Sequence, residues 1–105
     1  MKYLVPSVLS AVAMLASTCA SAQDAQQLNI RSLAATCANC HGTNGNAVQG
    51  SAVVSLAGVP KDYIITQMKA FKDGSRPATI MHQLSKGYSD AQVEQIAAYF
   101  AAQKK

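Results

Sequence analysis

The run Cys37-Ala38-Asn39-Cys40-His41 constrains this chain more than any other feature of its sequence. A C-x-x-C-H run is the attachment motif of covalent c-type haem. Its two thiols can add to the two vinyl groups of one porphyrin, and the imidazole that follows can reach the iron. A chain with this motif must fold around a large flat cofactor. We therefore predict covalent haem c at Cys37 and Cys40, with His41 as an iron ligand.

Two other interpretations of the cysteine pair need residues that the sequence lacks. A zinc site takes about four Cys or His ligands, usually as two pairs, and the further residues of these types are Cys19 and His82. A thioredoxin-like redox pair lies in a βαβ pattern, and nothing around the motif has the alternation of a strand. The sequence favours haem attachment over both.

The N-terminus has the parts of a secretory signal. Lys2 is positive, Leu4 to Ala16 is mostly apolar, and Ala20-Ser21-Ala22 fits the small-residue cleavage rule. The apolar stretch of about 13 residues is shorter than the roughly 20 that a membrane span needs. We predict a signal peptide at 1–22, cleaved after Ala22, and no integral membrane span after cleavage.

Cleavage leaves residues 23–105 as one small domain in the periplasm, and export agrees with haem attachment outside the cytoplasm. An uncleaved anchor and lipidation of Cys19 stay open as alternatives. A domain this short has a marginal hydrophobic core and usually needs a disulfide, a metal or a cofactor to stabilise its fold. A covalently attached haem would do so.

The charge balance does not indicate a nucleic-acid partner. The chain has nine Lys and Arg against five Asp and Glu, and loss of Lys2 leaves eight against five, a net charge of +3. Two haem propionates would lower this to near +1. The basic residues are scattered and no arginine or aromatic run accompanies them, so nucleic-acid binding is not expected.

Three segments have helical periodicity, and no segment has that of a strand, so the fold class is all-α. The first covers 24–36, with Asp24 as its cap. The second begins with Pro60 at its first position, carries an apolar face with Lys61, Lys69 and Lys72 on the outer side, and ends at Gly74. The third starts at Ser89, which forms a capping box with Gln92, and its buried stripe is Val93, Ile96, Ala97 and Phe100.

The segments 42–59 and 75–88 are predicted to be irregular, because both are rich in turn-forming residues. A structureless loop of about 18 residues is unusual in so small a domain. A loop that wraps over one edge of a haem would have a reason for this length.

The second iron ligand is predicted to be Met81. A His–Met pair makes a low-spin electron carrier, and the domain has two methionines, Met68 and Met81. Met68 lies on the apolar face of the second helix and is expected to fill the core. Met81 lies in the second irregular segment, where a loop could present its thioether opposite His41. The rival is His82, which would give a bis-histidine haem.

The chain resembles class I c-type cytochromes in the order of its features. Cys37, Cys40 and His41 lie near the mature N-terminus, Met81 lies about two-thirds of the way along, and the last helix contains Ala98-Tyr99-Phe100. The resemblance covers residues 26–103. It implies a small all-α fold, in which three to four helices pack around one covalently bound haem.

Residues 33–46 and Met68 to Gly74 are most similar to the cytochrome subunit of flavocytochrome c sulfide dehydrogenase. So are Ala78-Thr79-Ile80-Met81 and Lys86-Gly87-Tyr88-Ser89. In that family the methionine of the T-I-M run ligates the iron, which carries over to Met81. Many members carry two haems, whereas this chain has one motif and would be a single-haem version.

The resemblance implies an electron carrier, not an enzyme. Its donor would be an FAD-binding flavoprotein subunit that oxidises sulfide or another sulfur compound, and it would pass electrons to a downstream redox acceptor protein. The alternatives are a free soluble shuttle to a terminal oxidase or reductase, a haem enzyme or gas sensor with an open iron site, and a redox-inert structural haem. The loop residues Ala47-Val48 and Ala52-Val53-Val54 are unusually apolar for a solvated loop and either pack on the haem or bind the flavoprotein.

Overall fold

The computed structural model describes residues 21–105. The predicted signal at 1–22 and Cys19 therefore fall outside the described residues, except for positions 21 and 22. Within the described range no helix combines the length and the apolar character that crossing a membrane requires.

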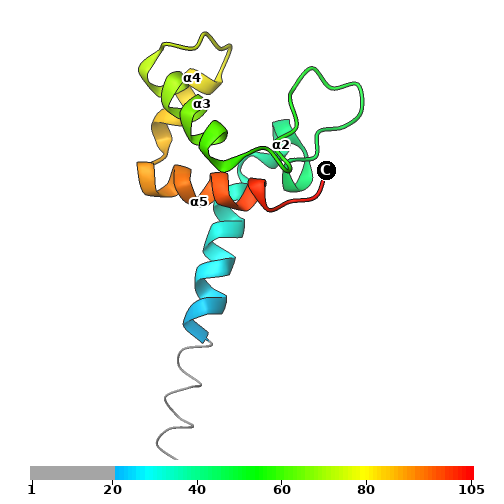
Figure 1. Ribbon diagram of the computed structural model, residues 1–105, viewed down its shortest axis with the longest axis vertical. Coiled ribbons are helices and arrows are strands. Elements are labelled where there is room, and N and C mark those ends of the chain that lie inside the picture. Colours follow the sequence, from blue (N-terminus) through cyan, green and yellow to red (C-terminus); the bar gives the residue numbers. More distant parts are fainter. Residues whose placement is uncertain (1–20) are drawn as a thin grey trace, which may run out of the picture.

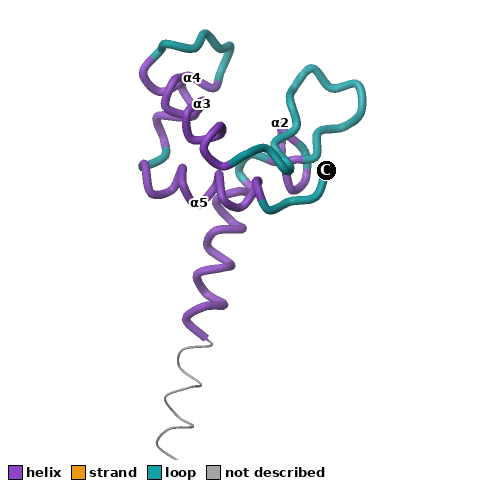
Figure 2. Tube along the Cα trace, viewed as in Figure 1, coloured by secondary structure: helices purple, strands orange, loops and turns teal. Residues whose placement is uncertain are grey.

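The described residues are helical and irregular and contain no strand, which confirms the all-α class (Figure 2). Three longer helices are joined by single helical turns and loops. The elements in chain order are a helix through residues 21–35, α2 (Ala38–His41), the 3-10 turn η1 (Thr43–Gly45), α3 (Lys61–Asp73), α4 (Met81–Leu84), the 3-10 turn η2 (Ser85–Gly87) and α5 (Asp90–Ala101).

The core lies where the first helix meets α3 and α5. Ala34 from the first helix, Ile64 from α3, and Ile96, Ala97 and Phe100 from α5 form one buried cluster. The alanines leave room for the helix backbones to approach, and Phe100, 1% exposed, fills the space between them. Figure 1 shows the first helix projecting from the domain beyond this junction. The buried stripe predicted for the last helix is confirmed.

The helix ends follow local sequence signals. Ser89 caps α5 by accepting the Gln92 N–H at 3.2 Å, and the Gln92 side chain accepts the Ser89 N–H at 2.9 Å, which confirms the capping box. Gly74 ends α3 with a positive φ of 82°. Pro60 differs from the prediction: it has an extended ψ of 136° and precedes α3, which begins at Lys61.

Two predictions about the second half of the domain are wrong. The segment 75–88 contains α4 and η2, so Met81 begins a helical turn instead of lying in an irregular loop. Lys72 is half-buried and not on the outer side of α3, because its ammonium donates to the Tyr88 carbonyl at 2.6 Å and lies 3.7 Å from the Asp90 carboxylate. Periodicity could not reveal either feature, because α4 is a single turn, too short to have a period, and the position of Lys72 depends on a contact with another segment.

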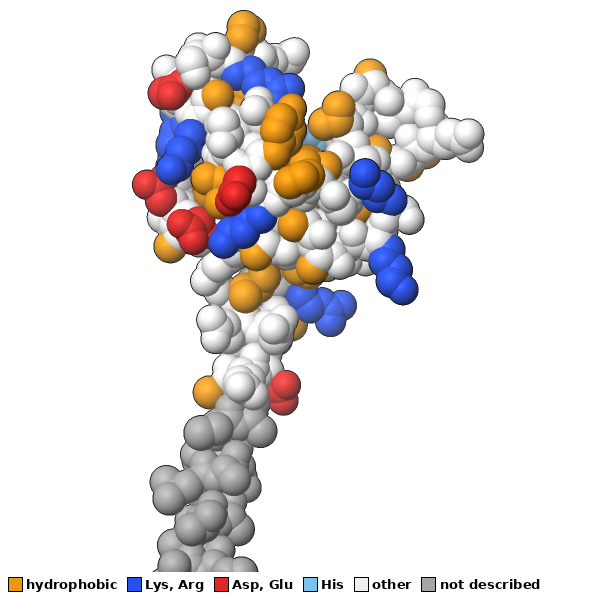
Figure 3. All heavy atoms as spheres, viewed as in Figure 1, with side chains coloured by type: hydrophobic (Ala, Val, Ile, Leu, Met, Phe, Trp, Pro, Cys, Tyr) orange, Lys and Arg blue, Asp and Glu red, His pale blue; other side chains and the backbone are white. Residues whose placement is uncertain are grey.

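A notch in the surface separates the upper part of the domain into two groups of elements. In Figure 1, α3 and α4 lie on one side, and α2 with the long loop that follows it lies on the other. The space-filling view shows the surface hollowed between these two parts, with hydrophobic side chains on both sides of the hollow (Figure 3). The fold thus presents α2, which ends at His41, and α4, which begins at Met81, on different sides of one apolar notch.

Candidate haem-attachment site

One turn of helix presents the three motif residues together. Cys37 is the residue before α2, and its carbonyl accepts the His41 N–H at 2.9 Å and the Cys40 N–H at 3.3 Å. Residues three and four apart are neighbours on a helical turn, so this turn keeps both Cys40 and His41 close to Cys37. Cys37 and Cys40 are not bonded to each other. Two free thiols are what thioether attachment requires.

The His41 ring is oriented by the long loop. Its Nδ1 lies 2.7 Å from the backbone carbonyl of Val54. A carbonyl can only accept a hydrogen bond, so Nδ1 carries the proton and donates it. This leaves Nε2 with the lone pair that a metal needs, and a fixed second bond of this kind is typical of histidines that ligate metals. Sequence patterns could not identify Val54, because the partner is a backbone atom.

Gly42 makes the tight turn that brings this loop back. It has φ 84° and ψ 163°, and a Cβ atom built on it would lie 1.9 Å from the Asn46 carbonyl oxygen. A side chain at this position is therefore incompatible with the turn. Glycine after the motif histidine lets the chain fold back on itself directly beside His41.

The two thiols have different surroundings. Burial, the largest effect, raises the pKa of the Cys37 thiol above its ordinary value; the Thr36 hydroxyl works in the opposite direction, and Cys40 raises the pKa further. Cys40 is exposed. Only the thiolate is strongly nucleophilic, so the free Cys37 thiol is held in its less reactive, protonated form.

The candidate residues for the opposite side lie together at the start of α4. Met81 and His82 are neighbours, and both are half-buried. Within the described residues, the His82 Nδ1 is buried and has no hydrogen-bond partner, so nothing orients this ring in the way that Val54 orients His41. Met68 packs against the core cluster, as expected for a core-filling residue. These contacts favour Met81 over both rivals.

The donor set fits haem c better than a metal ion or a redox dithiol. The described residues contain no group of three or more His, Cys, Asp or Glu side chains that could hold a metal ion. They also contain no strand, and a thioredoxin-like pair needs a βαβ unit. Two free thiols, an imidazole with Nε2 available, and a methionine at the start of the helix across the notch are the groups that His–Met haem c uses.

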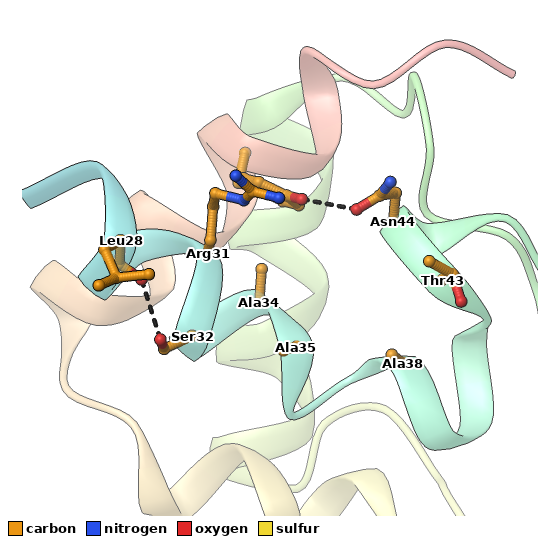
Figure 4. Close-up of a pocket in the computed structure, with 9 residues that line it drawn as sticks. Leu28, Arg31, Ser32, Ala34, Ala35, Ala38, Thr43 and Asn44 are labelled. Carbon is orange, nitrogen blue, oxygen red and sulfur yellow. Dashed lines mark hydrogen bonds between the residues drawn. The ribbon is translucent and has the colours of Figure 1, made fainter. Parts of the chain in front are cut away.

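A separate groove of about 390 Å³ lies between the first helix and the η1 turn. Figure 4 shows Arg31 and Leu28 on its helical side and Asn44 on the other, with a dashed hydrogen bond to Asn44. That bond comes from the Tyr99 hydroxyl to Asn44 Oδ1, at 2.6 Å. The groove contains no thiol, imidazole or thioether, so it is not the candidate site.

Residues 29–104 match the family model described as Cytochrome c. The cytochrome subunit of sulfide dehydrogenase from Chlorobaculum tepidum is 43% identical over 68 residues, which cover 65% of this chain and 60% of that protein. A thiosulfate dehydrogenase electron acceptor from Thiomonas intermedia is 37% identical over 71 residues, covering 68% of this chain and 33% of that protein. The matched region therefore spans less than two thirds of either relative.

Other similar proteins include one of comparable size and one of known structure. Cytochrome c-554(548) from Halomonas halodenitrificans is 38% identical over 74 residues, covering 66% of this chain and 86% of that protein. The solved structure of cytochrome c4 from Acidithiobacillus ferrooxidans superposes with a TM-score of 0.59 at 36% identity, covering 63% of this chain and 37% of that one.

Proposed function

This chain belongs to the cytochrome c family, and from that premise we propose that it is a periplasmic single-haem carrier in which His41 and Met81 ligate the iron. Membership makes it an electron-transfer protein with covalent haem c, not an enzyme. The cofactor supplies the one-electron chemistry, and the protein supplies ligands, orientation and a dry pocket. The single C-x-x-C-H motif in the sequence supports one haem.

The observation that carries this proposal is the hydrogen bond from His41 Nδ1 to the Val54 carbonyl. It gives the imidazole one orientation and one tautomer, directly beside two free thiols on the same helical turn. A bond of this kind at the second ring nitrogen is typical of histidines that ligate a metal. The apolar notch supports the same assignment, because a pocket of this kind excludes water from the iron (Figure 3).

The attachment and the ligands can be tested on the purified holoprotein. Thioether-bound haem stays with the protein in acid–acetone, and Cys37→Ala or Cys40→Ala should leave at most one thioether and little stable holoprotein.

Ferric His–Met haem has a weak charge-transfer band at about 700 nm, set by its ligands. We expect that band in the wild type and its loss in Met81→Ala. Full extraction of the haem, or a band that survives in Met81→Ala and disappears in Met68→Ala, would contradict the assignment; a spin-state change confined to His82→Ala would favour bis-histidine ligation.

We further propose that the electron donor is an FAD-binding subunit of a sulfide or sulfur-compound dehydrogenase. The names of two relatives, a sulfide dehydrogenase subunit and a thiosulfate dehydrogenase electron acceptor, support this class of partner. The alternative is a free shuttle to a terminal oxidase or reductase. A stable flavocytochrome requires an interface above the roughly 1,200 Å² of weak redox encounters. Copurification with a flavin-containing chain would favour the first partner.

The docking surface proposed for that partner is the loop that also orients His41. Val54 is 65% exposed although its carbonyl accepts the His41 hydrogen bond, and Val53 and Val48 of the same loop are also exposed. Lys61, Lys69 and Lys86 are exposed and could add electrostatic steering that weakens with salt. An apolar loop beside the iron ligand suits a partner that must approach the haem closely.

Val54→Asp tests this surface, because the substitution changes the exposed side chain and keeps the backbone carbonyl. We expect slower reduction by the flavoprotein and an intact haem spectrum. Leu28→Asp is the matched control, since Leu28 is 66% exposed but lies on the first helix. An unchanged rate in Val54→Asp would remove the loop from the interface, and a lost spectrum would place Val54 in the haem pocket.

A further inference from the structure

Two separate segments carry the proposed iron ligands. The attachment segment, residues 36–42, ends just after His41, and the Met81 segment, residues 75–88, carries the thioether. Within residues 21–105 a single hydrogen bond joins these two segments, between the Tyr88 hydroxyl and Thr36 Oγ1 at 2.6 Å. Thr36 directly precedes Cys37, so this bond ties the end of the Met81 segment to the first attachment residue.

The direction of this hydrogen bond follows from its neighbour. Thr36 Oγ1 also lies 2.7 Å from the Leu33 carbonyl, which can only accept. Thr36 has one hydroxyl hydrogen and donates it to the Leu33 carbonyl, which is much closer than the Cys37 Sγ at 3.9 Å. The Tyr88 hydroxyl is therefore the donor to Thr36. Two consecutive hydrogen bonds, from Tyr88 to Thr36 and from Thr36 to Leu33, thus connect the phenol to the backbone near the end of the first helix.

Tyr88 is held from its backbone side as well. Its carbonyl accepts the Lys72 ammonium at 2.6 Å, and Lys72 lies 3.7 Å from the Asp90 carboxylate. Its half-buried side chain packs against the core cluster. Tyr88 thus connects α3, through Lys72, with the attachment segment, through Thr36.

The other end of the Met81 segment is attached to α3 alone. The Arg76 N–H donates to the Ala70 carbonyl at 3.1 Å, its guanidinium donates to Gln67 Oε1, and it lies 4.7 Å from the centre of the Phe71 ring. These contacts hold the start of the segment but do not reach the attachment segment. The position of Met81 relative to His41 therefore depends, among hydrogen bonds, on Tyr88.

We propose that Tyr88 is a positioning residue whose hydroxyl holds the Met81 segment against the attachment segment and so limits how often Met81 leaves the iron. This rests on the proposed function, in which Met81 is the ligand. An external ligand can bind only to molecules in which Met81 has left, so its apparent affinity is scaled by the fraction of open molecules. Losing one hydrogen bond of ordinary strength would therefore raise the fraction of open molecules about fivefold.

The test is an imidazole titration of the ferric holoprotein, followed by haem absorption. Tyr88→Phe removes the donor and keeps the ring, and we expect it to lower the apparent dissociation constant about fivefold. Thr36→Val should lower it at least as much, because it removes this bond together with the bond from Thr36 to Leu33, and adding Tyr88→Phe to Thr36→Val should change nothing further. Thr36→Ser keeps the hydroxyl and should restore the wild-type affinity.

Tyr99→Phe is the matched control. The Tyr99 hydroxyl also makes a 2.6 Å hydrogen bond, to Asn44, which lies 55 positions away; Tyr88 and Thr36 lie 52 apart. The bond joins α5 to the η1 turn and does not touch the Met81 segment. We expect Tyr99→Phe to leave the imidazole affinity unchanged, although its effect on the denaturation midpoint should be comparable to that of Tyr88→Phe.

The outcomes separate the two hypotheses. An unchanged affinity in Tyr88→Phe, or an equal increase in Tyr88→Phe and Tyr99→Phe, would overturn the positioning role while leaving Met81 ligation intact. A wild type that matches Met81→Ala in spectrum and imidazole affinity would overturn Met81 ligation, and the positioning role with it. A higher imidazole affinity in Tyr88→Phe and Thr36→Val, with the wild-type affinity kept in Thr36→Ser and Tyr99→Phe, would support the proposal.

Discussion

Replacing Gly42 by alanine should remove a large share of the stability of this domain. Gly42 has φ 84° and ψ 163°, a conformation that is nearly confined to glycine and costs other residues about 1–3 kcal/mol. The new Cβ would also lie 1.9 Å from the Asn46 carbonyl oxygen and 2.9 Å from the Ala47 Cα. These are backbone atoms that cannot rotate away, and overpacking of this kind costs about 1–3 kcal/mol or more.

The two penalties together are about 2–6 kcal/mol, against a total stability of about 5–15 kcal/mol for a typical domain. Gly50→Ala separates them, because Gly50 also has a positive φ of 83° but nothing lies within 4 Å of a Cβ built there. Gly50→Ala should show the backbone penalty alone, and Gly42→Ala should show the backbone penalty and the steric penalty.

The free energy of unfolding of each holoprotein variant can be measured in guanidinium chloride, followed by far-ultraviolet circular dichroism. The two values can be compared directly when both variants have the same m-value. The haem spectrum should also change in Gly42→Ala and not in Gly50→Ala, because Gly42 follows His41 directly. Equal losses of stability in the two variants, within about 0.5 kcal/mol, would refute the tight turn described for residues 42–46.

Two further predictions concern the core and one surface carboxylate. Phe100→Ala should cost about 3–5 kcal/mol, because Phe100 is 1% exposed at the helix junction; a loss below about 1 kcal/mol in denaturant unfolding would contradict that packing. The Ser75 side chain, which has the largest effect, and the Ser75 N–H, donated to Asp73 Oδ1 at 2.8 Å, lower the pKa of Asp73 below its ordinary value. Its contribution to stability is therefore present above the ordinary carboxyl pKa and lost as the pH falls through the lowered value, and a carboxyl pKa at or above the ordinary value in an NMR titration would contradict it.

The helices of the domain could be predicted from the sequence because their signals are local. The capping box at Ser89 and Gln92 and the stop at Gly74 each depend on a few neighbouring residues, and both agree with the structure. The error at Lys72 arises from a contact with another segment, and α4 at Met81 is a single turn, too short to have a period. Two predicted helix starts also differ: Pro60 precedes α3, and Asp24 lies inside the first helix instead of capping it. Periodicity describes a segment by itself and carries no information about such contacts.

The same division applies to the candidate site. The residues that would bind haem are visible as a motif, but the atoms that orient them are not. The Val54 carbonyl is a backbone atom 13 positions from His41, and the Tyr88 hydroxyl reaches Thr36 across 52 positions. Side-chain patterns cannot reveal a backbone acceptor, and one sequence cannot pair two distant hydroxyls.

The orientation of His41 depends on a loop more than on a helix, and this changes which substitutions should affect the iron. α2 is a single turn and cannot fix an imidazole alone. The ring is fixed by the Val54 carbonyl, which the Gly42 turn and the hydrogen bonds of Gly45 to Leu56 and Ala57, at 2.8 and 3.1 Å, bring back towards α2. Substitutions that move this loop backbone should therefore alter the haem spectrum, whereas substitutions of equal cost in the α5 stripe should lower stability and leave the ligand geometry unchanged.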